Sequence, residues 1–129
     1  MNCKRVKVFF DGGCRPNPGR IEVAVVVRGV THRFDDVGYG SNEDAEWLAL
    51  IQAVRVARSC RLAEVELVGD AKEIVRRART ALEEGGARRG HAAAFLAAVL
   101  EAAPMQLSVR WIKRQQNLAG IALAASHPR

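Results

Sequence analysis

The order of strand-like and helix-like segments constrains the fold of this chain most strongly. Three strand-like stretches, at residues 5–10, 21–28 and 31–39, follow one another through short turns, which predicts an antiparallel meander. From residue 41 on, helical segments separate the later strands, which predicts parallel pairing through helical crossovers. We therefore expect an α/β fold, a mixed five-stranded sheet in the order β-β-β-α-β-α-α-β-α, with helices on its faces.

Capping and turn-forming residues locate the remaining helices and strands. Ser41 and Asp44 form a capping-box pattern, so the first helix is expected to open at Ser41. The other helices are expected at residues 71–84, 91–103 and 118–126, and the later strands at residues 63–68 and 106–112. Trp47 lies on the apolar stripe of the first helix and Trp111 lies in the last strand. Both tryptophans are therefore expected to pack in the core.

Composition favours one globular unit with an anionic partner. The 129 residues are 49% hydrophobic and 26% charged, which argues against disorder and predicts a single domain over residues 1–129. The formal net charge is +6, and 16 of the 20 basic residues are arginine. Arginine pairs well with phosphate, although a GC-rich genome explains the same bias. Apolar stretches stay shorter than the ~18 residues that a membrane span needs.

The N-terminus and the cysteines indicate a compartment. Residues 1–5 run directly into a strand-like stretch and lack the pattern of a signal peptide. Three cysteines, an odd number at distant positions, give neither a disulfide framework nor zinc-ligand spacing. We therefore expect a cytoplasmic, reduced protein without membrane contact; its oligomeric state is left open.

Three carboxylates stand where a strand ends or a helix begins. Asp11 and Asp70 each follow an apolar strand, and Glu46 lies in the first turns of a helix. Ligands of open α/β sheets bind at the carboxyl ends of the strands, and clustered carboxylates attract Mg²⁺ or Mn²⁺. Taken singly, Asp11 fits a turn residue, Glu46 a helix-dipole partner and Asp70 an N-cap. Their joint placement favours a metal site.

Four segments in order carry a resemblance to a known family. They are Phe10-Asp11-Gly12-Gly13-Cys14-Arg15-Pro16-Asn17-Pro18-Gly19, Ser41-Asn42-Glu43-Asp44-Ala45-Glu46-Trp47, Leu67-Val68-Gly69-Asp70-Ala71-Lys72 and Val109-Arg110-Trp111-Ile112-Lys113-Arg114-Gln115-Gln116-Asn117. Over about residues 5–126 the chain resembles ribonuclease H of type 1, including its short bacterial reverse-transcriptase-like members. The resemblance implies a ribonuclease H-like fold and a metal-dependent endonuclease that hydrolyses the RNA strand of RNA–DNA hybrids.

The resemblance also implies roles for individual residues. Asp11 would bridge two Mg²⁺ or Mn²⁺ ions, and Glu46 and Asp70 would complete their ligands and the catalytic set. The residues implied in nucleic-acid binding are Gly12, Gly13, Cys14, Asn17, Ser41 and Asn42.

Departures from the family pattern leave alternatives open. Ile121 stands where the family has a fourth Asp. Asp and Glu are absent after Glu101, so shifting the alignment by a few residues does not supply an acidic residue. The His-bearing loop and the long basic handle are also absent, with only Arg88 and Arg89 in the latter interval. Three alternatives follow: an active Mg²⁺- or Mn²⁺-dependent endonuclease whose turnover without the fourth Asp is slow or Mn²⁺-preferring, a hybrid-binding or nucleic-acid-binding module with impaired catalysis, or a scaffold for protein contacts. His127 and the terminal carboxylate are further candidate ligands.

Overall fold

The computed structural model describes residues 5–86 and 89–125. Its strands are β1 (Val6–Cys14), β2 (Gly19–Val27), β3 (Val30–Phe34), β4 (Tyr39–Gly40), β5 (Glu64–Gly69) and β6 (Gln106–Trp111). Its helices are α1 (Asn42–Ser59), α2 (Lys72–Glu84), α3 (Gly90–Glu101) and α4 (Leu118–Ala125), with the 3₁₀ turn η1 (Arg114–Gln116) before α4. Ser126, His127 and Arg88, which entered the sequence expectations, lie outside the described residues.

The sheet has the mixed topology that the sequence predicts. The strand order is β3-β2-β1-β5-β6; β1 pairs antiparallel with β2 and parallel with β5. The pairs β2–β3 and β5–β6 are antiparallel and parallel, respectively. This arrangement confirms the meander followed by crossovers, since each parallel neighbour is reached through helices.

The predicted strand over residues 31–39 is wrong in its second half. β3 ends at Phe34, and the two-residue strand β4 pairs separately with β2. Gly38 lies between them with φ +143°, a conformation that L side chains rarely adopt. The chain therefore turns between β3 and β4 instead of continuing as one strand.

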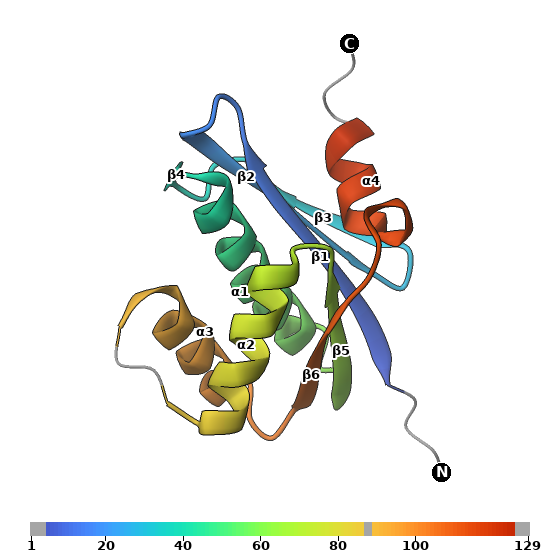
Figure 1. The fold of residues 1–129 in the computed structure, drawn as a ribbon. Coiled ribbons are helices and arrows are strands. Elements are labelled where there is room, and N and C mark those ends of the chain that lie inside the picture. Colours follow the sequence, from blue (N-terminus) through green and yellow to red (C-terminus); the bar gives the residue numbers. More distant parts are fainter. Residues whose placement is uncertain (1–4, 87–88, 126–129) are drawn as a thin grey trace.

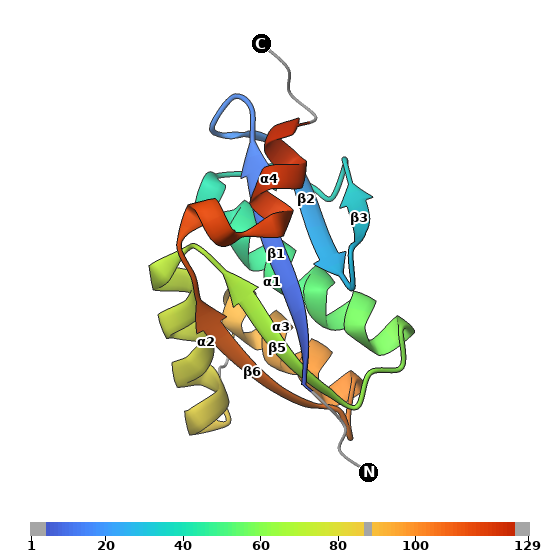
Figure 2. The same cartoon turned by 90° about the vertical axis from the view of Figure 1, so that its right-hand side faces the viewer.

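Helices cover the two faces of the sheet unequally. Figures 1 and 2 show α1, α2 and α3 together on one face and α4 alone on the other. The larger core lies under α1, α2 and α3 and includes Val8, Phe10, Leu50 and Phe95. A small second core joins Ala24 and Val26 of β2 to Ala119 and Leu123 of α4, with Phe9 packed against it. The helix α4 is thereby fixed over β1 and β2, beside the carboxyl end of β5.

Helix ends follow the local signals with one exception. Ser41 caps α1, and its pairing with Asp44 completes the expected capping box. Gly85 ends α2 in the left-handed conformation at φ +69°. The N-cap of α2 is Ala71 and forms no side-chain cap, so the interpretation of Asp70 as an N-cap is wrong. The Asp70 carboxylate thus remains outside the helix cap.

The two tryptophans differ in their surroundings. Trp47 is buried and lies beside the rings of His91 and Phe95, as expected for a core residue. Trp111 is 38% exposed, so its predicted core position is wrong. It lies on β6, which is an edge strand of the sheet. Along the described residues, we find no helix with the length and apolar character needed to cross a membrane.

Candidate metal centre and nucleic-acid surface

Strand register brings Asp11 beside Asp70. In the parallel ladder between β1 and β5, Phe9 is opposite Val68. Asp11 and Asp70 each lie two residues further along and therefore meet at the same edge. Gly69 is required there, because a Cβ on it would lie 2.5 Å from the Phe10 ring. The apolar strands and one glycine thus place two carboxylates together.

A second glycine brings Glu46 to the same place. A Cβ added to Gly12 would lie 2.2 Å from the backbone oxygen of Ala45, so only glycine permits this approach of α1 to β1. Gly12 follows Asp11 and Ala45 precedes Glu46. The close packing of these two backbones therefore carries Glu46 to the aspartates, as its position near the apolar stripe predicts.

The three carboxylates form a group suited to a divalent cation. One oxygen from each of Asp11, Glu46 and Asp70 lies within 4.8 Å of the others, and all three residues are partly buried. Oxygen ligands at such spacing suit Mg²⁺ or Mn²⁺. The residues therefore fit the cation that the sequence predicts.

Burial and mutual repulsion raise the pKa values of two of these carboxyl groups. Burial, and then the charge of Asp70, raise the pKa of Asp11 to about 7. Burial, and then the charges of Asp11 and Asp70, raise the pKa of Glu46 to about 7. The guanidinium of Arg114 lowers both pKa values but does not offset the other causes. A bound cation would relieve this repulsion.

Asn117 holds the centre together and was not predicted as a site residue. It is fully buried, and its Nδ2 donates to Asp70 Oδ2 and to the backbone oxygen of Phe10, both at 3.0 Å. Its Oδ1 accepts a hydrogen bond from the backbone N–H of Ala119 at 3.1 Å. One amide thus connects β1, the Asp70 carboxylate and the first turn of α4. Its place at the end of the fourth family-like segment is the sequence signal that could have indicated it.

The wall formed by η1 and α4 offers little to a cation. An open cavity of about 690 Å³ includes Asp11, Glu46 and Asp70, and is bordered here by Arg114, Gly120 and Ile121, among others. A Cβ on Gly120 would lie 3.5 Å from Asp11 Oδ2 and 3.6 Å from Asp70 Oδ2, whereas Ile121 is 52% exposed. Gly120 and Ile121 therefore both line the cavity, and the Gly120 backbone passes close to the two aspartates.

The β1–β2 connection and the start of α1 form a hydrogen-bonded surface beside the carboxylates. Asn42 Oδ1 accepts from the backbone N–H of Cys14 at 3.2 Å and from its Sγ at 3.3 Å. Asn17 Oδ1 accepts from the backbone N–H of Asn42 at 3.2 Å and from Cys14 Sγ at 3.6 Å. A Cβ on Gly13 would lie 4.0 Å from Asn42 Oδ1, so Gly13 also borders this surface. Four of the predicted binding residues therefore meet here.

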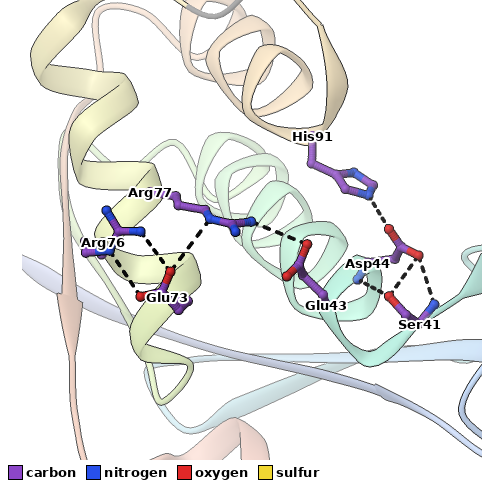
Figure 3. Close-up of polar contacts among 7 residues, drawn as sticks. All are labelled: Ser41, Glu43, Asp44, Glu73, Arg76, Arg77 and His91. Carbon is purple, nitrogen blue, oxygen red and sulfur yellow. Dashed lines mark hydrogen bonds and ion pairs between the residues drawn. The ribbon is translucent and has the colours of Figure 1, made fainter.

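Ser41 has a different setting. Its Oγ lies 3.1 Å from Asp44 Oδ2, which also accepts the Ser41 backbone N–H at 2.9 Å (Figure 3). Asp44 Oδ1 contacts His91 Nε2 at 2.8 Å (Figure 3). The Ser41 N–H and the His91 contact lower the pKa of Asp44. The predicted binding hydroxyl thus stands beside a carboxylate that holds α1 to α3.

Ion pairs also join α1 to α2. Arg77 contacts Glu43 at 3.4 Å and Glu73 at 3.9 Å, and Arg76 contacts Glu73 at 2.8 Å (Figure 3). These basic residues of α2 are therefore partly neutralised by acidic neighbours. Arg89, which the sequence places in the interval of the basic handle, is exposed at the N-cap of α3.

Comparison with known proteins identifies the family. The sequence pattern described as reverse transcriptase-like matches residues 9–127. The chain belongs to this family. A curated relative, ribonuclease HI of Halobacterium salinarum, is 38% identical over 73 residues. That match spans 53% of this chain and 37% of the relative, so the chain aligns with about a third of the relative's length.

Solved structures extend this reverse transcriptase-like family to a ribonuclease H fold. RNase H1 from Halobacterium salinarum has a TM-score of 0.71 at 25% identity, covering 93% of this chain and 94% of that chain. RNase H1 isolated from compost by a metagenomic approach has a TM-score of 0.69 at 27% identity, covering 95% and 93%. The N-terminal RNase H domain from Mycobacterium tuberculosis has a TM-score of 0.69 at 21% identity, covering 95% and 97%, and shows the fold alone.

Arg114 also borders the candidate site, and sequence reasoning did not predict it. It opens η1, borders the carboxylate cavity and acts electrostatically on Asp11 and Glu46. Its residue type carries no distinguishing signal in a chain with 16 arginines. Only the path of η1 across the carboxyl edge of the sheet reveals it.

Proposed function

We propose that the chain is a metal-dependent endonuclease that hydrolyses the RNA strand of RNA–DNA hybrids. The observation that carries this proposal is the group of Asp11, Glu46 and Asp70, with oxygens within 4.8 Å of one another on a ribonuclease H-like fold. A structure of the compost RNase H1 bound to an RNA/DNA hybrid has a TM-score of 0.67, covering 92% of this chain and 93% of that chain, and supports the comparison of folds at 24% identity.

Asp11, Glu46 and Asp70 would hold the Mg²⁺ or Mn²⁺. The cation, when bound, favours deprotonation of an attacking water and stabilises negative charge on the leaving oxygen. The chain contributes three carboxylate oxygens from two strand ends and one helix. Asn117 fixes the orientation of Asp70 by its hydrogen bond to Oδ2, so one ligand is positioned before the cation enters.

Asn17 and Asn42 are the proposed readers of the hybrid. Each side-chain oxygen accepts a backbone N–H, which fixes the amide orientation. Among residues 5–86 and 89–125, neither amide nitrogen has a hydrogen-bond partner. Two donor groups are thus available for acceptors in a minor groove, where 2′-hydroxyls distinguish RNA from DNA. Gly12, Gly13 and Cys14 would support this contact, and Ser41 would contribute at its margin.

The presence of Ile121 in place of an acidic residue argues that this activity is reduced. Neither Gly120 nor Ile121 carries an oxygen ligand, so α4 leaves the cation with three carboxylates. We expect slow turnover that is faster with Mn²⁺ than with Mg²⁺. Mg²⁺ demands near-ideal octahedral coordination, whereas Mn²⁺ tolerates less regular coordination and binds such a site at least as tightly as Mg²⁺ does.

A second candidate function is recognition of the hybrid without cleavage. The feature that favours it is the same apolar α4 wall, together with the preserved amide surface of Asn17 and Asn42. Hybrid binding that weakens steeply with added salt, without cleavage, would support this alternative.

The deciding experiment is cleavage of a hybrid with labelled RNA in millimolar Mg²⁺ and then Mn²⁺. Asp70→Asn is the matched control, since it keeps the shape of the ligand and removes its charge. We expect cleavage by the unmodified chain, faster in Mn²⁺, and none by the variant. An intact hybrid in both metals, with binding retained, would instead establish the recognition function.

A further inference from the structure

The outer edge of β3 is open. β3 stands at one end of the sheet, and among residues 5–86 and 89–125 no strand pairs with its outer side. Figure 2 shows β3 at the margin of the sheet with β2 as its neighbour. Val30 is 57% exposed, whereas Val27, its partner on β2, is buried. Because an edge strand presents backbone donors and acceptors to any further strand, β3 is a place where the sheet can be extended.

The hairpin between β2 and β3 determines which backbone groups face outward. The two strands are joined by a two-residue turn with φ 51° at Arg28 and φ 81° at Gly29, as in a type I′ turn. Val30 flanks this turn and therefore belongs to a hydrogen-bonded pair with β2. Hydrogen-bonded and non-hydrogen-bonded pairs alternate along an antiparallel ladder. Thr31 and Arg33 consequently direct their backbone N–H and C=O groups away from β2.

One register uses all of these outward groups. Two copies of β3 related by a two-fold axis at His32 place Thr31 of each copy opposite Arg33 of the other. Both outward-facing residues of each strand then form hydrogen-bonded pairs, and each pair exchanges two N–H···O bonds. An axis at Thr31 or at Arg33 would set one outward residue against its own copy and the other against a residue beyond β3. The backbone therefore favours the axis at His32.

Side chains complement one another in the same register. Alternate residues of β3 share the face that α1 covers, since their partners on β2 belong to the larger core. On this face, Val30 of one copy lies opposite Phe34 of the other. Next to them, Arg28 lies opposite Asp36, and both are exposed and opposite in charge. The N–H after Asp36 donates to the backbone oxygen of Ile21 at 3.3 Å, so the chain remains beside β2 at this point.

The charge of Arg33 does not oppose this pairing. Charged side chains on an edge strand usually discourage a second strand. Here the Arg33 guanidinium contacts Asp35 Oδ1 at 2.6 Å within the same chain, which balances its charge. Successive side chains of a strand point to opposite faces, so Arg33 also lies on the other face from Val30 and Phe34. The apolar and ionic pairs therefore form without it.

We propose that a second copy of this chain docks antiparallel on β3, around a two-fold axis at His32, and joins two sheets into one. The contact is short, with one five-residue strand from each copy, so we expect weak association with a Kd of about 10–500 µM. Residues 28–36 lie outside the residues that line the carboxylate cavity. The association therefore stands independently of the proposed hydrolysis, and cleavage assays at nanomolar protein observe the monomer.

Sedimentation velocity of the full chain, without nucleic acid and over concentrations that span this Kd, measures the association. Thr31→Pro removes an outward N–H while it leaves the bonds between β2 and β3 in place, and it should abolish the dimer. Thr31→Val is the matched control, because it keeps the N–H and the β-branched shape. It should form dimers within about twofold of the unmodified Kd.

Charge reversal tests the side-chain register and remains decisive if Thr31→Pro fails to fold. Arg28→Glu and Asp36→Arg each set like charges against each other across the axis and should raise the Kd at least about fivefold. The double variant should restore the Kd to within about twofold of the unmodified value. Arg79→Glu makes the same charge change on α2, which packs beside β6 at the opposite end of the sheet. It should leave the Kd unchanged.

A disulfide trap tests the axis itself. In a non-hydrogen-bonded antiparallel pair the Cα atoms lie about 4.5 Å apart, which a disulfide spans. His32→Cys should therefore cross-link two copies under mild oxidation, and Arg33→Cys should do so at least about fivefold less. Peptide mapping distinguishes this link from links through the exposed Cys60. A chain that stays monomeric at every concentration, or a dimer that tolerates both Thr31→Pro and the single charge reversals, would overturn the proposal.

Discussion

Two walls of the same cavity are built from opposite chemistry. The β1–α1 wall, defined by Asp11, Cys14, Asn42 and Glu46, combines carboxylates with a hydrogen-bonded amide. The η1–α4 wall, defined by Arg114, Gly120 and Ile121, presents one guanidinium and apolar surface. The difference shows that the capacity to hold a metal comes from the sheet edge and α1, while the last helix contributes position and charge.

The unequal walls also have unequal anchorage. The β1–α1 wall depends on two close approaches that glycines permit, the backbone of α1 against Gly12 and the Phe10 ring against Gly69. The η1–α4 wall depends on the side chain of Asn117 and on the small core beneath α4. Substitutions on the first wall should therefore change chemistry most, and those on the second should tune chemistry or stability.

The largest effect should follow from removing a ligand on the β1–α1 wall. Asp11→Asn replaces a central carboxylate by a neutral amide, so we expect at least a thousandfold loss of hybrid cleavage, in line with losses of several kcal/mol in transition-state stabilisation. The assay is initial-rate cleavage in saturating Mn²⁺. Asp36→Asn, at an exposed residue, is the matched control and should leave the rate unchanged; an equal loss in both variants would contradict the assignment.

The next largest effect should come from adding a carboxylate to the η1–α4 wall, as the β1–α1 wall already has. Ile121→Asp adds a carboxylate to the η1–α4 wall, and we expect at least a tenfold increase in the cleavage rate, because a better-held cation activates water more effectively. Ile121→Asn introduces a polar group without the charge and should give a much smaller gain. Equal rates for Asp, Asn and Ile at this position would show that the missing ligand is not what limits the site.

The sequence predicted the sheet because its evidence is local and repeated. Apolar runs bounded by glycine and helical spacing in α1 determine element type, and the order of elements limits the topology. The split at Gly38 was missed because the glycine's φ depends on how β4 pairs with β2. The exposure of Trp111 was missed because a strand pattern alone does not tell an edge strand from a central one.

The carboxylate group was predictable, while the opposite wall was not. Asp11 and Asp70 follow strands whose parallel register aligns them, so their meeting follows from topology. Asn117 and Arg114 act through a buried hydrogen bond and a through-space charge, and neither interaction leaves a pattern in residue spacing. The close approach of Gly120 to the two aspartates likewise became visible only when the position of α4 over β1 was known.

A smaller effect should result from removing the anchor of the η1–α4 wall. Asn117→Ala leaves Asp70 Oδ2 and the Phe10 carbonyl without their donor, which should lower the free energy of unfolding by about 2–4 kcal/mol. Urea unfolding measures this change. Gln116→Ala, at an exposed neighbour, should cost less than about 0.5 kcal/mol; similar losses in the two variants would argue against the anchoring role.

The smallest effect concerns the pH dependence of the metal-free protein. Folding raises the pKa of Asp11 and of Glu46 to about 7, so the folded state binds more protons than the unfolded state between about pH 4 and pH 7. The stability due to these groups is therefore present in acid and declines as pH rises through 7. In EDTA, Asp11→Asn should reduce this decline and raise the Tm at pH 8 by about 2–8 °C.

Calorimetry at pH 5 and pH 8 checks that prediction. Mn²⁺ should raise the Tm of the unmodified chain at pH 8 and have little effect at pH 5, where protons compete for the ligands. A metal-free Tm that increases from pH 5 to pH 8 more in the unmodified chain than in Asp11→Asn would contradict the raised pKa of this carboxyl.

The position of Trp111 makes the site observable by tryptophan fluorescence. Its indole N–H donates to the backbone oxygen of Asp70 at 3.1 Å, and Lys72 Nζ lies 4.7 Å from its ring centroid. The chain's other fluorophore of this kind, Trp47, is buried in the core away from solvent quenchers. A change in emission or in iodide quenching when a cation or nucleic acid binds would therefore arise mainly from Trp111, so the unlabelled protein carries its own reporter beside Asp70.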